Sequence, residues 1–520
     1  MINKVVRKVV IVGGGTAGWL TAGVIAAEHN SKSDSGLQVT LIESPEVNIV
    51  GVGEGTWPTM RETLSKIGIS ETDLFRECEA SFKQGVKFSK WVTGAEDDYY
   101  YHPFVLPHGH TQTDLIFPWQ KHRDKISFAD AVSYQGQLCE QGRAPKLIST
   151  PEYAGISNYA YHLNAVKLGQ LLQKHCVEKL GVTHVVDHVT DINSAINNDI
   201  ASVTTKNNGD ISGDLFIDCS GLSSILLAQH FKIPFISKKH ILFNDTALAV
   251  QVPYLDNKAP ITSHTVSTAQ RSGWIWDIAL PSRRGVGYTY SSQHSSDKEA
   301  EIELRAYIES SIGKVETDKL MIRKISFNPG HREKFWHKNC VAIGMASGFL
   351  EPLEASALIL VELAAAKISN EMPTTRDSMD IVAKRYNTQF LYRWDRIIDF
   401  LKLHYILSKR TDSAYWTDNC KPETIPEELQ ELLTLWKQQP PGPQDFYHLN
   451  EIFTSSSWQY ILYGMGFKTN KNELSRKFIN DEMAHHFFSE NVKLTKKYLS
   501  ALPSNRELID KIKQYGMNKV

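Results

Sequence analysis

The hydrophobic pattern at the amino end predicts a strand, a tight turn and a helix. A β-branched run over residues 8–12 precedes glycines at 13, 15 and 18, and apolar residues then follow helical spacing through about Glu28. A second apolar run over 37–42 ends at Glu43. This order of strand, GxGxxG and helix is typical of the first βαβ unit of a dinucleotide-binding domain.

Each glycine of the turn has a physical reason. Gly13 permits the tight turn, Gly15 lets a pyrophosphate approach the backbone, and Gly18 lets helix and strand pack closely. The helix start then offers unpaired N–H groups to the phosphates, and the carboxylate of Glu43 is placed to accept the ribose hydroxyls. No second turn of this quality follows, which favours a resident flavin over NAD(P)H. The predicted FAD-binding residues of this unit are Gly13, Gly14, Gly15, Thr16, Ala17, Gly18 and Glu43. A chance glycine turn with a surface glutamate is the alternative.

The rest of the chain alternates between two patterns. Apolar strands ending in glycine turns occur at 215–221 and 340–348, whereas 91–150 and 240–325 show period-two alternation with many aromatic residues. From about Arg376 the spacing becomes helical. We therefore predict an α/β fold, α+β overall. A discontinuous Rossmann-like FAD-binding domain of the monooxygenase type would comprise 1–90, 151–239 and 326–370. A β-rich substrate-side insertion (91–150 and 240–325) and a helical carboxyl-terminal substrate region (371–520) complete the prediction.

The amino-acid composition of the chain limits the kinds of partner that it is expected to bind. The 520 residues carry 57 Lys+Arg against 58 Asp+Glu, so no excess of positive charge favours nucleic acid or an anionic membrane as partner. The six cysteines are scattered without a CxxC pair, and the histidine pairs at 108/110 and 485/486 lack a third ligand, so no metal site is predicted. No apolar run reaches the length of a membrane span. We expect a soluble, cytoplasmic protein.

Several local sequences together resemble the tryptophan halogenase family of flavin-dependent halogenases. The matching segments run in order from residue 9 to about 416 and cover most of the chain. They are the GGGTAG opening, VGVGEGT at 50–56 with Pro58, ASFKQGVKF at 80–88, WIWDI at 274–278, GFLEPLE at 348–354, RWDR at 393–396 and LHY at 403–405.

The resemblance implies a two-part reaction. Reduced FAD, supplied by a separate flavin reductase, reacts with oxygen to give a flavin hydroperoxide, which chloride or bromide attacks to form hypohalous acid. This acid then halogenates an electron-rich aromatic substrate, namely tryptophan, indole or an indole derivative. Lys83 matches the family's catalytic lysine, which presents the electrophilic halogen. Glu354 matches its essential glutamate, which orients that species or deprotonates the ring intermediate.

The resemblance also implies binding residues. The halide would lie at the N–H groups of Ser356 and Ala357, and Trp274 and Trp276 would separate substrate from flavin. His102 and Phe104 would stack on the substrate ring. The further FAD contacts implied are Val189, Met345 and Leu358.

Each assignment has a structural alternative. Lys83, at the end of a predicted helix, could be a solvated lysine, and Trp274 and Trp276 could be core aromatics. Glu354 lies close to the start of the helical pattern at 353–368, where a carboxylate could simply stabilise the helix. Free halide-binding amides require this helix to begin nearer Ala355 than Pro352.

The chain departs from the family pattern at three alanines. Ala279 stands where proline is usual, and Ala355 and Ala357 replace residues that are commonly serine and glycine. These changes, and the lack of a match to the segment that grips the amino acid, leave indole or a larger indolic compound as an option. An FAD-dependent aromatic monooxygenase and a flavin-binding protein without catalysis are the rival functions. A homodimer is an open option.

Overall fold

The computed structural model describes residues 5–46, 53–448, 450–471 and 480–519. Residues 50–52 of the VGVGEGT motif therefore lie outside the described residues. The chain divides into two compact units. The first unit comprises 1–80, 163–238 and 328–394, and the second comprises 81–162, 239–327 and 395–520. Both units are discontinuous, and the carboxyl-terminal region predicted as a separate part is shared between them.

The first unit is built on a six-stranded sheet. Its strands, in spatial order, are β20 (Trp336–His337), β21 (Cys340–Ala342), β12 (Leu215–Asp218), β1 (Lys8–Val12), β2 (Gln38–Glu43) and β8 (Thr183–Val186). Strand β1 runs parallel to both β12 and β2. The parallel centre confirms the predicted α/β class, and the glycine turn after β1 lies at the carboxyl edge, where doubly wound sheets bind ligands.

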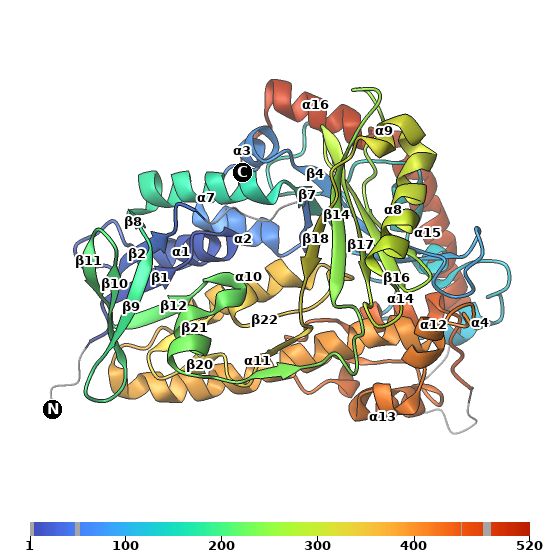
Figure 1. Cartoon of the computed structure of the whole chain (residues 1–520). Helices are drawn as coiled ribbons and strands as arrows, with labels where there is room; N and C mark the ends of the chain where they lie inside the picture. The colour runs from blue at the N-terminus through green and yellow to red at the C-terminus, as the bar shows by residue number, and fades with distance from the viewer. Residues whose placement is uncertain (1–4, 47–52, 449, 472–479, 520) are drawn as a thin grey trace. The chain divides into compact units, whose positions relative to one another are not determined.

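Helices and a second sheet cover this centre. Because side chains alternate along a strand, β1 presents Val9 and Ile11 to one face and Val10 and Val12 to the other. Helix α1 (Thr16–Glu28) packs on β1 and β2 and contacts α7 (Ala165–Leu180) and α10 (Ser356–Asn370). The Val10 side joins a core with residues of the three-stranded sheet β9–β11 (Figure 1). The strands of that sheet are β9 (Val189–Ser194), β10 (Ile200–Thr205) and β11 (Gly209–Ser212), and the unit also contains α2 (Met60–Ile67), α3 (Glu71–Glu77), β13 (Phe235–Ser237), β19 (Gly330–Arg332) and β22 (Gly348–Phe349).

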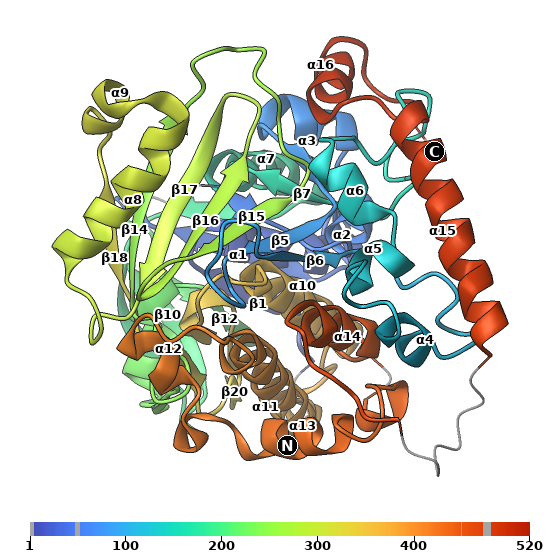
Figure 2. The same cartoon turned by 90° about the vertical axis from the view of Figure 1, so that its right-hand side faces the viewer.

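The second unit contains a seven-stranded, mostly antiparallel sheet. Its strands, in spatial order, are β18 (Arg323–Ser326), β14 (Thr246–Pro253), β17 (Arg283–Tyr290), β16 (Gly273–Ala279), β15 (Thr265–Ala269), β5 (Gly85–Ser89) and β6 (Tyr99–Pro103). Helix α8 (Asp297–Ile312) lies along β14 and β17 and buries Leu304 and Ile308 against them (Figure 2). The predicted β-rich character of 240–325 is confirmed, with α8 and α9 (Lys314–Asp318) as additions.

The predicted β-rich character of 91–150 is wrong. This segment supplies only β6 and then forms three short helices. The helices are α4 (Ile116–Gln120), α5 (Phe128–Val132) and α6 (Gln135–Glu140). Helix α5 starts where the Ser127 hydroxyl accepts a hydrogen bond from the Asp130 amide. Such side-chain caps act over three residues and are invisible to a search for strand alternation.

The predicted helical region from 371 onward is confirmed. Its helices are α11 (Arg376–Ile406), α12 (Ala414–Asn419), α13 (Glu427–Trp436), α14 (Ser455–Gly464), α15 (Asp481–Ala501) and α16 (Asn505–Tyr515). Helix α15 packs against α4, α5 and α6 in the second unit (Figure 2). Within the described ranges, no helix combines the length and apolar character that crossing a bilayer requires.

Candidate functional site

The glycine turn after β1 has the predicted conformation. Gly13 has φ +121°, and a Cβ atom there would lie 2.2 Å from the carbonyl oxygen of Cys219. A Cβ atom on Gly18 would lie 1.9 Å from the carbonyl oxygen of Gly13. Helix α1 begins at Thr16, and Gly15 as N-cap supplies no side-chain cap to its first turn. The turn therefore presents backbone amides at the helix start, as the sequence predicts.

The space around this turn fits a dinucleotide phosphate. A Cβ atom on Gly15 would meet nothing within 4 Å, whereas one on Gly14 would meet the side chain of Glu43 at 2.2 Å. The carboxylate of Glu43 therefore lies beside the turn, where its Oε2 is 2.9 Å from Nε2 of His184. Open space at Gly15, uncapped amides and an adjacent carboxylate are the features that a bound FAD requires. His184 is a neighbour of the site that sequence reasoning missed.

The remaining predicted FAD contacts all belong to the first unit but differ in how far they are buried. Met345 is 46% exposed, and its methyl carbon approaches Gly221. Ala17 of the glycine turn lies against Gly344, the neighbour of Met345. Leu358 is buried on α10, and Val189, at the start of β9, packs on the core of the sheet. The structure thus brings Ala17 and the Met345 segment together, but Val189 is partly core.

The start of α10 leaves its first amides uncapped. The helix begins at Ser356 rather than at 353, and its N-cap Ala355 adopts the left-handed conformation, with φ 53° and ψ 42°. Free halide-binding amides require this helix to begin nearer Ala355 than Pro352, and the structure confirms that it does. The N-cap residue offers no side-chain hydrogen bond, so the N–H groups of Ser356 and Ala357 have no partner from a cap. A left-handed alanine costs roughly 1–2 kcal/mol.

Glu354 immediately precedes this strained residue and is 3% exposed. Its main-chain carbonyl oxygen accepts a hydrogen bond of 2.8 Å from Nε1 of Trp57. The amide of Ala355 donates to the carbonyl oxygen of Pro352 at 3.0 Å. A buried carboxyl group thus lies next to the start of α10, where the first amides have no carbonyl partner within the helix.

Lys83 lies on a strand, not at the end of a helix. Helix α3 stops at Glu77, Glu79 takes a left-handed φ of 51°, and β4 (Ser81–Lys83) then pairs with β7 (Ala160–Leu163). The prediction failed because this pairing joins segments about 80 residues apart. Gly85 opens β5, as predicted.

The ammonium group of Lys83 is packed against an aromatic ring. Lys83 is 1% exposed, and its Nζ is 5.4 Å from the ring centroid of Phe104. The backbone of Phe104 is fixed from both sides, because its amide donates to Gln135 Oε1 at 2.7 Å and its carbonyl accepts from Asn158 Nδ2 at 2.9 Å. The second unit therefore holds a buried amine and a partly exposed ring next to each other.

His162 is a neighbour of Lys83 that sequence reasoning missed. It stands opposite Ser81 in the β4–β7 register, which places it on the same face as Lys83. Burial, and then the charges of Lys83 and His264, hold the pKa of His162 well below its usual value. The side chains of Lys83 and His162 therefore share one buried face of the β4–β7 pair.

The other predicted substrate-side residues are buried in the second unit. The ring of His102 lies 5.7 Å from that of Phe400 and 6.2 Å from that of Tyr460. Trp274 and Trp276 have ring centroids 6.2 Å apart on β16, where both faces of the strand are covered. Trp276 lies over Gly287, where a Cβ atom would meet its ring at 2.0 Å.

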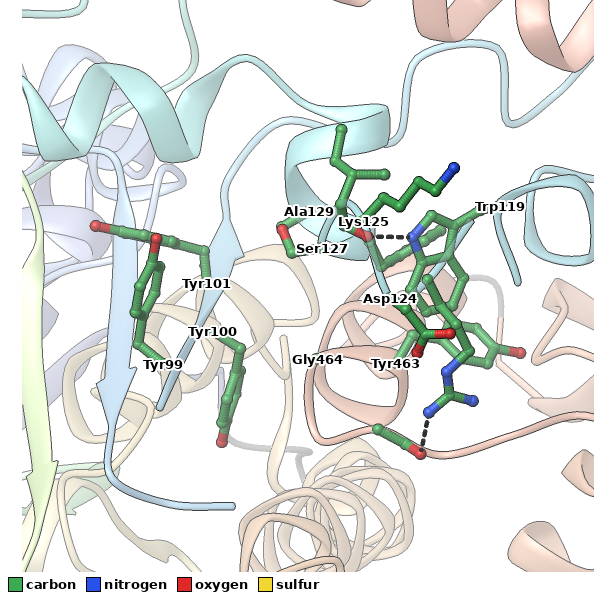
Figure 3. A pocket seen from close by; sticks show the side chains of 14 residues that line it. Tyr99, Tyr100, Tyr101, Trp119, Asp124, Lys125, Ser127, Ala129, Tyr463 and Gly464 are labelled. Carbon is green, nitrogen blue, oxygen red and sulfur yellow. Dashed lines mark hydrogen bonds between the residues drawn. The ribbon is translucent and has the colours of Figure 1, made fainter. Parts of the chain in front are cut away.

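A cavity of about 410 Å³ lies beside β6 in the same unit (Figure 3). Figure 3 shows Tyr99, Tyr100 and Tyr101 along one side and Trp119 and Tyr463 along the other. Several of its polar groups are already hydrogen-bonded within the fold. Tyr100 Oη is 2.7 Å from His404 Nδ1, and Trp119 Nε1 donates to the carbonyl oxygen of Ile126. Its lining does not include Lys83 or Phe104.

Glu362, on α10, is another of the buried carboxyl groups of the first unit. The Thr63 hydroxyl donates to its Oε2 at 2.7 Å, and burial raises its pKa from 4.5 to about 8. The folded protein therefore holds a proton that the unfolded chain releases between these values, so stability falls as pH rises across this window.

We expect Glu362→Gln to remove this pH dependence, since glutamine keeps the hydrogen bond without a charge to desolvate. The variant should be more stable than the parent at pH 8.5, by at most a few kcal/mol, and similar to it at pH 5. Thermal unfolding at both pH values checks this. Parallel pH slopes for the two proteins would contradict it.

Comparison with known proteins decides the family. The family model described as tryptophan halogenase matches residues 8–481. The chain belongs to the tryptophan halogenase family. It is 33% identical over 480 residues to the tryptophan 6-halogenase SttH of Streptomyces toxytricini, covering 88% of this chain and 89% of that protein.

Solved structures agree with this placement of the halogenase chain. The crystal structure of a tryptophan halogenase from Shewanella frigidimarina superposes with a TM-score of 0.96 at 49% identity, covering 100% of both chains. Tar14, a tryptophan C-6 flavin-dependent halogenase from taromycin biosynthesis, superposes with a TM-score of 0.89 at 31% identity, covering 97% of this chain and 99% of that one. Membership of this family of flavin-dependent halogenases implies FAD as the cofactor and a halide as a co-substrate.

Proposed function

We propose that this protein is an FADH2-dependent halogenase that halogenates tryptophan, indole or an indole derivative by electrophilic substitution. The observation that carries the proposal is that the two residues matching the family's catalytic lysine and glutamate both lie in surroundings suited to that chemistry. The buried amine of Lys83 lies beside an aromatic ring, and the buried Glu354 precedes an uncapped helix start. An aromatic hydroxylase would require neither a buried amine nor uncapped amides next to a carboxyl group.

The residues that would hold FAD are those of the glycine turn, together with Glu43 and Met345. When bound, the reduced cofactor would supply two electrons to oxygen, so that FADH2, O2, a halide ion and a proton would give FAD, hypohalous acid and water. Amides of Ser356 and Ala357 would bind the halide, because a helix start carries partial positive charge.

The chemistry at the substrate ring is assigned to two side chains. Lys83 would hold the hypohalous acid by a hydrogen bond or accept its halogen, since a lysine buried among apolar groups presents a reactive amine. A carbon–halogen bond would form on the ring as the oxygen–halogen bond breaks, the released oxygen would take a proton from the Lys83 nitrogen and leave as water, and Glu354 would take the ring proton as general base. Return of that proton to Lys83 through solvent completes the cycle. Phe104 and His102 would contact the ring, and Trp274 and Trp276 would keep it from the flavin.

The partners of this reaction belong to the same proposal. A separate flavin reductase would supply reduced FAD by diffusion, and the enzyme would act in the cytoplasm on a small aromatic substrate, without nucleic acid, membrane or metal. A homodimer is the oligomeric state to test by light scattering.

We expect Gly15→Ala to weaken FAD binding without unfolding the protein. The added methyl group would occupy the open space at the turn, where it meets no protein atom and Gly15 has an ordinary φ of −72°. The FAD dissociation constant should rise about tenfold or more, with an unchanged melting temperature of the apoprotein. Gly18→Ala is the contrasting variant, because its methyl group would overlap the Gly13 carbonyl and destabilise the fold. Unchanged FAD affinity in Gly15→Ala would remove the turn from the cofactor site.

The substrate class is tested with the protein, FAD, a flavin reductase, NADH, oxygen and either bromide or chloride. Tryptophan, indole and substituted indoles are offered in parallel. We expect a halogenated indolic product. A hydroxylated product that forms without halide would instead identify a monooxygenase, and consumption of reduced FAD without any product would identify a flavin-binding protein without catalysis.

A further inference from the structure

Trp57 contacts the main chain at the proposed catalytic glutamate. Its indole Nε1–H donates to the carbonyl oxygen of Glu354 at 2.8 Å, and both residues belong to the first unit. The two residues are 297 positions apart in the chain. Neither the glycine turn nor the lysine motif assigns Trp57 a part in the reaction.

This contact fixes one peptide plane from both sides. The carbonyl oxygen of Glu354 and the amide of Ala355 belong to the same planar unit. The carbonyl oxygen accepts from Trp57, and the amide donates to the carbonyl oxygen of Pro352 at 3.0 Å. Because both ends of the unit are held, ψ of Glu354 and φ of Ala355 cannot change independently of these two bonds.

The fixed peptide lies where the backbone is strained. Ala355 has φ 53°, and rotation of the peptide unit by half a turn would return this φ to the ordinary region. The hydrogen bond from Trp57 opposes that rotation, because a rotated peptide would leave the carbonyl oxygen of a buried residue without its donor. Rotation would also turn the Glu354 carbonyl oxygen toward the Pro352 carbonyl oxygen, which now accepts from the Ala355 amide, so the backbone of Glu354 and of the first residues of α10 would have to shift.

The segment around Trp57 is anchored to the same helix farther along. The Thr63 hydroxyl donates to Glu362 Oε2 at 2.7 Å, and the Thr59 hydroxyl contacts Glu362 Oε1 at 3.5 Å. Glu362 lies two turns after the start of α10. Residues 57–63 are therefore bound both to Glu354, just before α10, and to Glu362 within α10, and this second attachment helps to place the indole N–H at the Glu354 carbonyl.

We propose that Trp57 is a positioning residue that holds the Glu354–Ala355 peptide in its strained orientation and thereby keeps Glu354 and the Ser356 and Ala357 amides ready for halide and substrate. This inference rests on the proposed halogenase function. Trp57 would act through the main chain, by its hydrogen bond to the Glu354 carbonyl oxygen.

The test replaces the indole by a ring that cannot donate. Trp57→Phe keeps an aromatic side chain but removes the N–H group. Trp336→Phe is the matched control, because Nε1 of Trp336 also donates to a main-chain carbonyl, that of Lys338, at 3.0 Å in the same unit. Two quantities are measured in each variant: the KM for bromide against kcat, and the increase in melting temperature that bromide produces with oxidised FAD bound.

We expect Trp57→Phe to raise the bromide KM about tenfold and to reduce the bromide-induced stabilisation. Trp336→Phe should lose stability but keep the parent's bromide KM. Adding Ala355→Gly to Trp57→Phe should restore part of the bromide affinity, because glycine removes the strain that drives the peptide rotation. A merely structural tryptophan would show no such rescue.

Two results separate the failure of this inference from failure of the proposed function. If the parent protein halogenates and Trp57→Phe retains the parent's bromide KM and bromide-induced stabilisation, the positioning role of Trp57 is wrong. If Trp57→Phe is impaired but Ala355→Gly gives no recovery, the peptide mechanism is wrong. If the parent protein itself gives no halogenated product, the proposed function fails, and the bromide-induced stabilisation still reports on the helix start.

Discussion

Lys83→Ala is expected to abolish halogenation while FAD still binds. Nucleophilic or acid–base side chains typically contribute factors of about 10²–10⁴, so the rate of product formation should fall by about 10³ or more. FAD affinity should not change, because Lys83 is not among the residues that would hold FAD. Product formation under saturating substrate and the FAD dissociation constant are the two measurements.

Two further lysine variants sharpen this result. Lys87→Ala is the matched control, because Nζ of Lys87 also lies over an aromatic ring, 4.4 Å from the centroid of Tyr99, and pairs with Glu140. It should retain activity. Lys83→Arg should remain inactive, since a guanidinium keeps the charge but offers no amine that loses its proton. An active Lys83→Ala would exclude the lysine from the chemistry.

Glu354→Gln should lower turnover at saturating substrate by about 10²-fold or more, because the variant keeps the shape of the side chain but cannot accept the ring proton. The loss of that base should make proton removal rate-limiting. Deuterium at the reacting ring position should then slow the variant but not the parent protein. Glu371→Gln, at the other end of α10, is the control and should behave as the parent.

Unchanged turnover in Glu354→Gln would remove this residue from the reaction. A lower rate without the deuterium effect would leave it the task of orienting the halogen species. The variant should not disturb the hydrogen bond from Trp57, because that bond is made to the main-chain carbonyl.

The parts of the fold that follow from local sequence were predictable. The strand, glycine turn and helix over 8–28 depend on neighbouring residues, and the structure places β1 and α1 where the pattern indicates. The start of α10 at Ser356 was likewise predictable. A halide can bind the amides of Ser356 and Ala357 only if the helix begins near Ala355 and its first turn is uncapped.

The parts that depend on distant pairing were not predictable. Ser81–Lys83 forms a strand only because residues 160–163 pair with it, so the apolar spacing over 74–82 indicated a helix that continues to Lys83. Trp57 is invisible for the same reason, because its partner is 297 residues away. His162 carries no local signal either, since it becomes a neighbour of Lys83 only through the β4–β7 register.

The most direct test of the central proposal is the mass spectrum of the product formed from indole with FAD, a flavin reductase, NADH, oxygen and bromide. The proposed function predicts a monobrominated product with the paired isotope peaks of bromine, present with the parent protein and absent with Lys83→Ala at equal FAD occupancy. A hydroxylated indole that forms equally well without bromide would contradict it.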